Sequence, residues 1–493
     1  MNFPGVRKQG ELGSFRPSSV ATWILVAAFM VACIESNPQP SPQGNSAMDA
    51  VSTDTQDWAE DTATNLTDGV AQDDGILKDL VAEDAMDSAG DAEVVLDDTV
   101  DIDDADQTSE DVEDTLEEIE VVPCVGEGCA AGPGWAPDPS VNGPYPVGVR
   151  TYSLDLLDHL GNPRTIRVEV WYPTTDEYVD GPFDAIDFYV DAPEDIKPVV
   201  EQYQGQLPSI PVDASRDAPP RIADGPFPLV VFSHGAYGVR FQSVFFTVPL
   251  ASHGYVVVSA DHTGNVLYDL LVGEYNMDDM ILSAFDRPLD AVALIDDVFQ
   301  RNEDPDDDLY GMINESEVGI SGHSFGGYTS LNLGFTDPRI KAVLPMAPAT
   351  TPLGLLGFDA ATFPVPMMMM AGAMDKTLPP DGEMREPYKE YPSPKFYFEL
   401  NAGGHFTYSD ICQLDLLYIA NDLGIDDADN ALNDGCADYN VPSEIAHPLI
   451  RQFGIGFFNY YLRHSDESLQ WFNAEAAAMF PEILTYLDDM IPD

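Results

Sequence analysis

The chain has 493 residues, and 86 Asp and Glu against 21 Lys and Arg give it a net charge of −65. A nucleic-acid-binding protein needs a basic face that neutralises phosphates, so this composition argues against that class. Apolar residues make up 44% of the chain and predict a sizeable hydrophobic core. The charge and the apolar residues are unevenly distributed, which divides the chain into three segments, 1–33, 34–140 and 141–493.

The first segment, residues 1–33, has the pattern of an export signal. Three basic residues precede an apolar run, 20–32, which at 13 residues is short for a membrane span. The run closes with MVAC at 30–33, which resembles the lipobox of bacterial lipoproteins, although Leu is more usual than Met at its first position. The resemblance implies cleavage before Cys33, acylation of that cysteine and anchoring to a bacterial membrane. The alternative is an ordinary cleaved signal, an incidental cysteine and a secreted protein.

The second segment, residues 34–140, is predicted to be a disordered acidic spacer. Residues 34–123 carry a net charge of −27 and almost no aromatic residues, so burial of apolar surface cannot offset chain entropy. We expect a tether with an end-to-end distance of about 50 Å or more, because like charges extend the chain. Calcium binding by carboxylates such as those at 101–104 is the alternative, but no EF-hand spacing is present.

Four cysteines follow Cys33 in the chain: Cys124, Cys129, Cys412 and Cys436. They permit three pairings, of which Cys124–Cys129 with Cys412–Cys436 is the most economical. Disulfides fit an oxidising, extracytoplasmic compartment. Zinc binding is a weaker alternative, because no histidine lies at ligand spacing near these cysteines. We therefore expect two disulfides, no metal and no other cofactor.

The third segment, residues 141–493, has the alternating pattern of an α/β protein. Expected strands cover 165–172, 228–232, 255–260, 317–320, 342–346, 365–372 and 395–400, and expected helices cover 242–253, 288–300, 326–335 and 448–463. Continuous apolar runs, such as YVVVSA at 255–260, are typical of central strands buried on both faces. The pattern predicts a mainly parallel, doubly wound sheet with helices on both faces, with functional sites at the carboxyl ends of its strands.

The most informative motif is GHSFG at 322–326, a G-x-S-x-G sequence between an expected strand and an expected helix. A nucleophile on such a tight strand-to-helix turn needs glycine two positions before and after it, because β-carbons there would clash. Gly322 and Gly326 meet this need, and Ser324 is the predicted nucleophile. The alternative is a glycine-rich turn with a passive serine.

A nucleophilic serine needs a base and a carboxylate that orients the base. Asp375 follows the expected strand 365–372, and His405 lies in a glycine-rich loop after the expected strand 395–400. Three reactive side chains thus follow three strand ends in the order Ser, acid, His. The other seven histidines are weaker candidates for the base. Asp359 and Asp410 are alternative acids, but neither follows a strand.

The same chemistry needs donors for a tetrahedral oxyanion. The glycine-rich sequence FSHGAYG at 232–238 follows a strand, so its backbone N–H groups can face outward. We predict that the N–H groups of Ala236 and Phe325 form the oxyanion hole, since Phe325 is the residue after the nucleophile.

These motifs resemble the α/β-hydrolases that include plasma-type platelet-activating-factor acetylhydrolases, dienelactone hydrolases and bacterial polyester hydrolases. The matching sequences are GPYPVG (143–148), EVWYP (169–173), FSHGAYGVR (232–240), LASHGYVVVSADH (250–262), GHSFGGYTS (322–330) and DPRIKA (337–342). The resemblance implies an α/β-hydrolase fold and a metal-free serine esterase. The acetylhydrolase branch carries its acid where this chain has PMAP at 345–348, so Asp375 matches the dienelactone and polyester hydrolases instead. The nucleophile is serine rather than the cysteine of typical dienelactone hydrolases.

The combined pattern predicts a serine carboxylic-ester hydrolase that acts through an acyl-enzyme. Insertions at 174–226 and 264–285 could shape its pocket, and the apolar residues of the second could line an acyl site or simply pack: Met277, Met280, Leu282 and Phe285. The acidic charge favours neutral, short-chain or lipid-like esters over anionic ones. The alternatives are an inactive hydrolase-fold binding protein and an acyltransferase with the same triad. We expect a monomer without a nucleic-acid partner.

Overall fold

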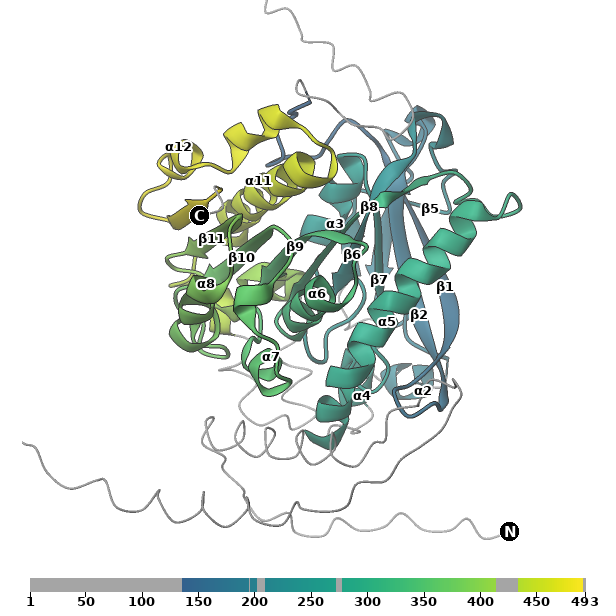
Figure 1. Cartoon of the computed structure of the whole chain (residues 1–493). Coiled ribbons are helices and arrows are strands. Elements are labelled where there is room, and N and C mark those ends of the chain that lie inside the picture. The colour runs from purple at the N-terminus through teal and green to yellow at the C-terminus, as the bar shows by residue number, and fades with distance from the viewer. Residues whose placement is uncertain (1–134, 195, 202–208, 272–276, 414–432, 491–493) are drawn as a thin grey trace, which may run out of the picture. The chain divides into compact units, whose positions relative to one another are not determined.

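A computed structural model of the protein describes residues 135–194, 196–201, 209–271, 277–413 and 433–490 (Figure 1). The expected signal peptide, nearly all of the expected acidic linker, and Cys33, Cys124 and Cys129 lie outside these ranges. Within them, no helix combines the length and the apolar character that crossing a bilayer requires.

A ten-stranded sheet with the order β12-β11-β10-β9-β8-β6-β7-β2-β1-β5 forms the centre of the fold. Strands β6 to β11 run parallel to one another, whereas β2 and β12 run antiparallel to them. Strand β1 pairs antiparallel with β2 and parallel with β5. The predicted mainly parallel sheet is confirmed. Its strands are β1 Val147–Leu157, β2 Pro163–Pro173, β5 Ser215–Arg216, β6 Phe227–Ser233, β7 Val256–Ala260, β8 Ile313–His323, β9 Ile340–Met346, β10 Met367–Gly372, β11 Lys395–Leu400 and β12 Leu484–Asp489.

Helices cover both faces of this sheet (Figure 1). The α-helices are α2 Lys197–Val200, α3 Val244–Ser252, α4 Leu267–Leu271, α5 Met277–Glu303, α6 Phe325–Thr336, α7 Thr351–Leu355, α8 Glu386–Glu390, α11 Ser443–Leu462 and α12 Ala474–Ala477. Short 3₁₀ or π turns are η1 Asp176–Tyr178, η3 Ile222–Asp224, η4 Ala360–Thr362, η5 Asp381–Arg385, η6 His405–Tyr408, η7 Asp410–Gln413 and η8 Asp466–Trp471. A separate hairpin, β3 Asp184–Asp187 with β4 Ser209–Val212, lies within the insertion 174–226.

Two hydrophobic cores form because alternate residues of each central strand point to opposite faces of the sheet. In β6, Val230 and Phe232 pack in the core that includes α3 and α11. Leu229 and Val231 pack in the core that includes α5 and α6. Both faces are therefore covered, which is why all seven residues of β6 are buried and its sequence is continuously apolar.

Two helices extend across prolines that were expected to mark their starts. Proline is typical of a first helical turn, so the sequence favoured starts at 288 and 448. Instead α5 begins at Met277 and α11 at Ser443, with Pro288 and Pro448 inside them. Pro288 has no N–H to donate to the Ala284 carbonyl, and the Tyr328 hydroxyl of α6 donates to that carbonyl at 2.9 Å. Both predicted starts were wrong, and in α5 this tertiary contact replaces the missing helical hydrogen bond.

The chain already packs on the fold at Trp135, six residues before the expected domain start at 141. The Trp135 side chain is 4% exposed, and the Arg463 guanidinium lies 4.9 Å from the centre of its ring. The Trp135 carbonyl accepts hydrogen bonds from the hydroxyls of Ser465 and Ser468. The last residues of the expected linker thus contact the end of α11.

Candidate active site

Ser324 stands on a strained turn between β8 and α6. Its φ of 57° and ψ of −115° are rare for a residue with a side chain, and α6 begins at the next residue. The Ser324 N–H donates to the Met346 carbonyl at the end of β9, at 2.8 Å. The turn therefore holds the serine at the carboxyl ends of two parallel strands, in the geometry of a nucleophile elbow.

Both glycines of the motif lie where a side chain would collide with backbone. A β-carbon on Gly326 would stand 1.8 Å from the Ser233 carbonyl oxygen at the end of β6. A β-carbon on Gly322 would stand 2.5 Å from the Gly326 carbonyl oxygen and 2.6 Å from the Ser233 oxygen. The start of α6 is thus pressed against the end of β6, which brings the serine close to the loop that follows β6.

The structure brings together the three side chains expected to react. His405 Nε2 lies 2.9 Å from Ser324 Oγ, and His405 Nδ1 lies 2.7 Å from Asp375 Oδ2. Asp375 follows β10 and His405 begins η6 after β11, so their contact joins the ends of two neighbouring parallel strands, whereas Ser324 follows β8, two places beyond β10 in the sheet. Asp375 and His405 are 4% and 2% exposed. The end of β9, where acetylhydrolases carry their acid, has the sequence Met346-Ala347-Pro348 and no carboxylate.

The contacts fix the proton positions in this group. A carboxylate only accepts hydrogen bonds, so His405 carries its proton on Nδ1 and its Nε2 lone pair faces the Ser324 hydroxyl. The second Asp375 oxygen accepts from the Leu378 N–H at 2.7 Å. Burial disfavours the imidazolium of His405, but the charge and hydrogen bond of Asp375, with the charge of Asp434, outweigh burial and raise the pKa of His405 above 6.5. The imidazole is thus arranged as a general base.

A second carboxylate, Asp434, holds the two loops that carry Asp375 and His405. One Asp434 oxygen accepts from the His405 N–H at 3.2 Å. The other accepts from the N–H groups of Lys376 and Thr377 at 3.0 and 2.8 Å, and from the Thr377 hydroxyl at 2.7 Å. Sequence reasoning missed Asp434, because it lies in an Asp-rich stretch that is typical of solvated surface. Its position two residues before Cys436 was the one available signal.

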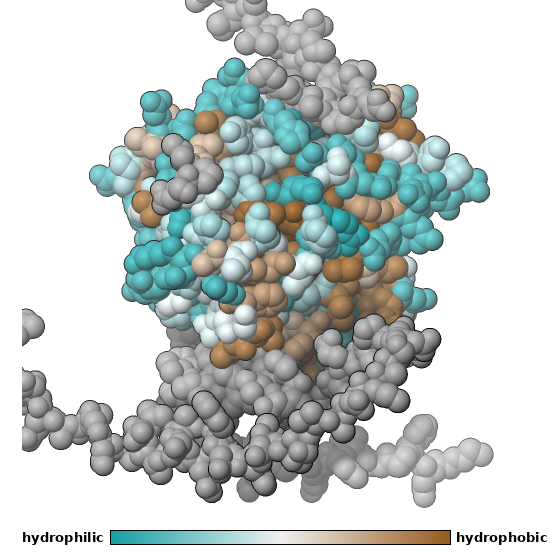
Figure 2. Space-filling model, in the orientation of Figure 1, coloured by the Kyte–Doolittle hydropathy of each residue, from teal (hydrophilic) through white to brown (hydrophobic). Residues whose placement is uncertain are grey.

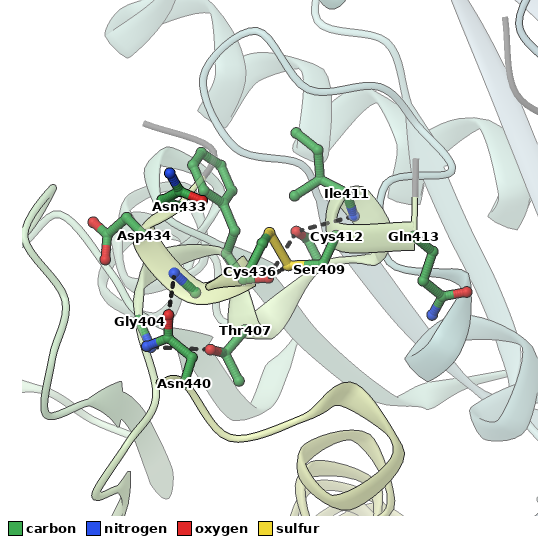
Figure 3. Close-up of a disulfide and its surroundings, with 12 residues drawn as sticks. Gly404, Thr407, Ser409, Ile411, Cys412, Gln413, Asn433, Asp434, Cys436 and Asn440 are labelled. Carbon is green, nitrogen blue, oxygen red and sulfur yellow. Dashed lines mark hydrogen bonds between the residues drawn. A yellow bond between two sulfur atoms is a disulfide. The ribbon is translucent and has the colours of Figure 1, made fainter. Parts of the chain in front are cut away.

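The predicted Cys412–Cys436 disulfide is present, with a sulfur–sulfur distance of 2.04 Å. It joins η7 to the turn that carries Asp434, next to the loop of Gly404 and Thr407 (Figure 3). A β-carbon on Gly404 would stand 2.4 Å from the Gly435 nitrogen, so this turn packs directly on the residue before His405. The disulfide thus braces the segment that positions the base. The other predicted pair, Cys124–Cys129, lies outside the described residues.

The loop after β6 carries one predicted oxyanion donor, Ala236, and the start of α6 carries the other, Phe325. Neither amide N–H has a hydrogen-bond acceptor within the described part of the chain. A β-carbon on Gly235 would stand 3.4 Å from the Ser324 β-carbon, so this loop lies against the nucleophile. Both amides thus keep an N–H group without an acceptor in the described chain, as donors to an oxyanion require.

A hydrogen-bonded chain of side chains connects this loop to the base. The Gln242 side chain accepts from the Gly235 N–H at 3.0 Å and lies 2.8 Å from His323 Nδ1. His323 Nε2 donates to the His405 carbonyl at 2.9 Å, so Nδ1 accepts from the Gln242 amide. Burial, followed by the charge of His405, lowers the pKa of His323 well below 6.5, which keeps this ring neutral. His323 thus connects the loop after β6 to the segment that carries His405.

Two of the apolar residues of the second insertion, Met280 and Phe285, pack against a hydrophobic core. Met280 and Phe285 contact the core between the sheet and α5, and the Phe285 ring lies 5.5 Å from that of His159. Leu282 is half-buried on the same helix. In the described ranges, no group of three or more His, Cys, Asp or Glu residues is arranged to hold a metal ion.

Comparison with known proteins supports the same group of enzymes. Residues 220–417 match the PET hydrolase-like family, and residues 136–267 match the family of platelet-activating factor acetylhydrolase, isoform II. The folded segment is therefore similar to the α/β-hydrolase group that contains these two families. The PET hydrolase-like match contains Ser324, Asp375 and His405, whereas the acetylhydrolase match ends before all three.

Individual relatives are distant and match only in part. Cutinase Est1 of Thermobifida alba is 25% identical over 180 residues, which cover 36% of this chain and 53% of the cutinase. Platelet-activating factor acetylhydrolase of Cavia porcellus is 26% identical over 259 residues, which cover 44% of this chain and 56% of that enzyme. The chain thus spans about half the length of these curated relatives. A solved structure of ferulic acid esterase from Streptomyces cinnamoneus has a TM-score of 0.49 and 21% identity, covering 70% of this chain and 97% of that chain.

Replacing Asp434 by Asn should lower the pKa of His405, because the variant loses one of the two negative charges that favour the imidazolium. The neutral ring, which is the form that accepts a proton, then persists to lower pH. NMR titration of the His405 ring nitrogens measures this pKa directly. Asp438→Asn removes the same charge from an exposed position four residues away and should leave the pKa unchanged. Equal pKa values in the two variants would contradict the role of Asp434.

Proposed function

We propose that this protein is a serine carboxylic-ester hydrolase that acts through an acyl-enzyme. One observation carries the proposal: a hydroxyl on a strained elbow is hydrogen-bonded to a buried imidazole, which is hydrogen-bonded in turn to a buried carboxylate. This is the arrangement that activates serine toward carbonyl carbon. The names of its relatives, a cutinase and a platelet-activating factor acetylhydrolase, agree with ester hydrolysis.

The reaction follows from the positions of these groups. His405 Nε2 takes the proton of Ser324 as the serine oxygen attacks the ester carbonyl, and Asp375 stabilises the imidazolium that forms. The N–H groups of Ala236 and Phe325 donate to the oxyanion, each contributing about 2.7–4 kcal/mol to the barrier reduction. His405 then protonates the leaving alcohol, and the acyl group stays on Ser324. Water, deprotonated by His405, releases the acid by the reverse sequence.

Neutral, short-chain or lipid-like esters suit this site better than anionic ones. Residues 124–493 carry 17 basic and 57 acidic residues, so an anionic substrate meets a repulsive field. Met374, next to Asp375, and Tyr439, whose hydroxyl accepts from Lys376 at 2.8 Å, are 39% and 51% exposed. They offer apolar surface beside the triad, in keeping with an apolar substrate.

We also propose that the protein acts outside the cytoplasm, anchored by lipid on Cys33. Support comes from the basic residues, the apolar run 20–32 and the MVAC sequence that ends at Cys33. The Cys412–Cys436 disulfide fits an oxidising compartment.

Replacing Ser324 by Ala should lower kcat for p-nitrophenyl acetate by roughly 10⁴-fold or more and abolish burst release of p-nitrophenol, because no acyl-enzyme can form. Stopped-flow absorbance measures both. Ser330→Ala, a buried serine on the following helix, is the matched control and should retain burst and turnover. Undiminished turnover in Ser324→Ala would refute the esterase proposal, as would product analysis showing that an added alcohol captures the acyl group while water does not.

A pair of activated esters that differ in charge tests the substrate class. At low ionic strength kcat/KM should be about tenfold or more higher for a neutral butyryl ester than for the matching anionic hemisuccinate, because the field of the domain repels the anion. Salt screens that field, so 0.5 M NaCl should narrow the ratio. A ratio near one that salt does not change would argue against exclusion of anions. A neutral acyl series from C2 to C12 in the same assay defines the preferred chain length.

Replacing Cys33 by Ser should abolish incorporation of radiolabelled palmitate when the full chain is produced in a bacterial host, because the acylated thiol is lost. It should also move the protein from the membrane fraction to the soluble extracytoplasmic fraction. Cys412→Ser is the control that removes a different cysteine and keeps the label. Labelling that persists in Cys33→Ser, or is absent from the unmodified chain, would contradict the anchor.

A further inference from the structure

A buried arginine of α5, Arg287, is hydrogen-bonded to the loop after β6 that carries the predicted oxyanion donor Ala236. The side chain of Arg287 is fully buried. Its Nη1 donates to the His234 carbonyl at 2.6 Å, and its Nη2 donates to the Gly235 carbonyl at 3.0 Å and to Asn265 Oδ1 at 2.6 Å. Burial lowers the pKa of Arg287 to about 9, so the side chain remains a cation at neutral pH.

Arg287 also contacts the residue that carries the second predicted donor. Its guanidinium carbon lies 4.7 Å from the centre of the Phe325 ring. A cation over an aromatic face at this distance is attractive, and more so where water is excluded. One buried positive charge therefore touches both halves of the predicted oxyanion hole.

The contact with Gly235 determines the direction of the Ala236 N–H. In a trans peptide the C=O and the following N–H point in opposite directions, and the 235–236 peptide is not among the cis bonds of the described chain. The Gly235 carbonyl accepts from Arg287, from His234 Nδ1 at 2.7 Å and from the Gly238 N–H at 3.1 Å. The Ala236 N–H must then point away from Arg287. Donors on a carbonyl also polarise its peptide, which strengthens the N–H of the same unit as a donor.

The backbone amide of His262 keeps the His234 ring in place for this contact. His234 Nε2 accepts from the His262 N–H at 3.1 Å. The His262 ring is held between the Ser233 hydroxyl at 2.9 Å and Asp290 at 2.8 Å. Ser233, His262 and Asp290 repeat the composition of the triad, but each is at most 2% exposed. This buried set therefore supports the loop and offers no accessible nucleophile.

We propose that Arg287 is a positioning residue of the oxyanion hole, whose buried cation aims and polarises the Ala236 N–H through the Gly235 carbonyl. Arg287 contacts no residue of the triad, so its effect reaches the reaction through the loop after β6 and the Phe325 ring that it touches. The inference rests on the proposed esterase activity. If the proposal is correct, replacing Arg287 weakens binding of the tetrahedral transition state and leaves binding of the planar ester nearly unchanged.

The test compares Arg287→Gln and Arg287→Lys with Arg463→Gln in the full chain. Arg463 is a matched control, because it is also fully buried, donates to the Gly254 carbonyl and lies over an aromatic ring. Gly254 precedes β7, so Arg463 lies at the end of the sheet opposite the triad. For each variant kcat and KM are measured with p-nitrophenyl acetate. The inhibition constant of an alkyl trifluoromethyl ketone, which forms a tetrahedral adduct with the active serine, and the melting temperature are measured in parallel.

Arg287→Gln should lower kcat by about tenfold or more and change KM by less than about twofold. It should raise the inhibition constant of the ketone by the same factor by which kcat/KM falls. Arg287→Lys keeps the charge but loses the planar guanidinium. Its kcat and its ketone affinity should therefore lie between those of Arg287→Gln and those of the unmodified chain. Arg463→Gln should lose thermal stability while kcat and ketone affinity stay within about twofold.

The proposal would be overturned if Arg287→Gln lost no more kcat and no more ketone affinity than Arg463→Gln. It would also be overturned if kcat fell in Arg287→Gln while the ketone bound as tightly as before. If Arg287→Gln does not fold, Arg287→Lys and His234→Gln provide the same comparison, since His234 donates to the same carbonyl. Failure of the esterase proposal itself is recognised separately, because the unmodified chain would then not hydrolyse the ester.

Discussion

The contact between the first turn of α6 and the end of β6 is the constraint on which the site depends. No atom of a side chain fits between Gly326 and the Ser233 carbonyl, so backbone meets backbone there. This closeness places the strained Ser324 beside the loop that begins at His234. Larger residues at either glycine would separate the nucleophile from its oxyanion donors, and no rearrangement of flexible side chains could compensate, because the colliding atoms are main chain. The apolar strands on both sides provide the rigid frame that sustains the strain.

A single hydrogen-bonded network then joins the loops that follow β6, β8, β10 and β11. Gln242 links the Gly235 amide to His323, His323 links to the His405 backbone, and Asp434 links His405 to the loop after Asp375. Each link is buried or half-buried, where a broken hydrogen bond costs about 1–3 kcal/mol. Because every loop end is tied to a neighbour, the relative positions of hydroxyl, imidazole and carboxylate are set before any substrate arrives. Such preorganisation is the main means by which enzymes stabilise developing charge.

The reactive residues at strand ends could be predicted because the sequence around each of them already indicates a strand and the turn after it. The elbow glycines, the order of Ser324, Asp375 and His405, and the economical Cys412–Cys436 pairing all follow from chemistry that can be read along the sequence. Asp434 and Arg287 could not be identified in this way, since their importance comes from backbone groups that reach them only in the folded chain. Asp434 resembles its acidic neighbours, and Arg287 is an isolated basic residue in a helix. The edge strand β12, with an acidic sequence, likewise depends on a partner that lies elsewhere in the chain, β11.

The position of Trp135 has a consequence for the separation of the chain's entry into the fold from its reactive groups. Trp135 packs near Gly254, at the amino ends of the parallel strands, and the reactive groups lie at their carboxyl ends. The described chain therefore begins on the fold at one end of the sheet and carries its reactive groups at the other end. The packing of Trp135 and the chemistry at Ser324 thus use separate ends of the parallel strands.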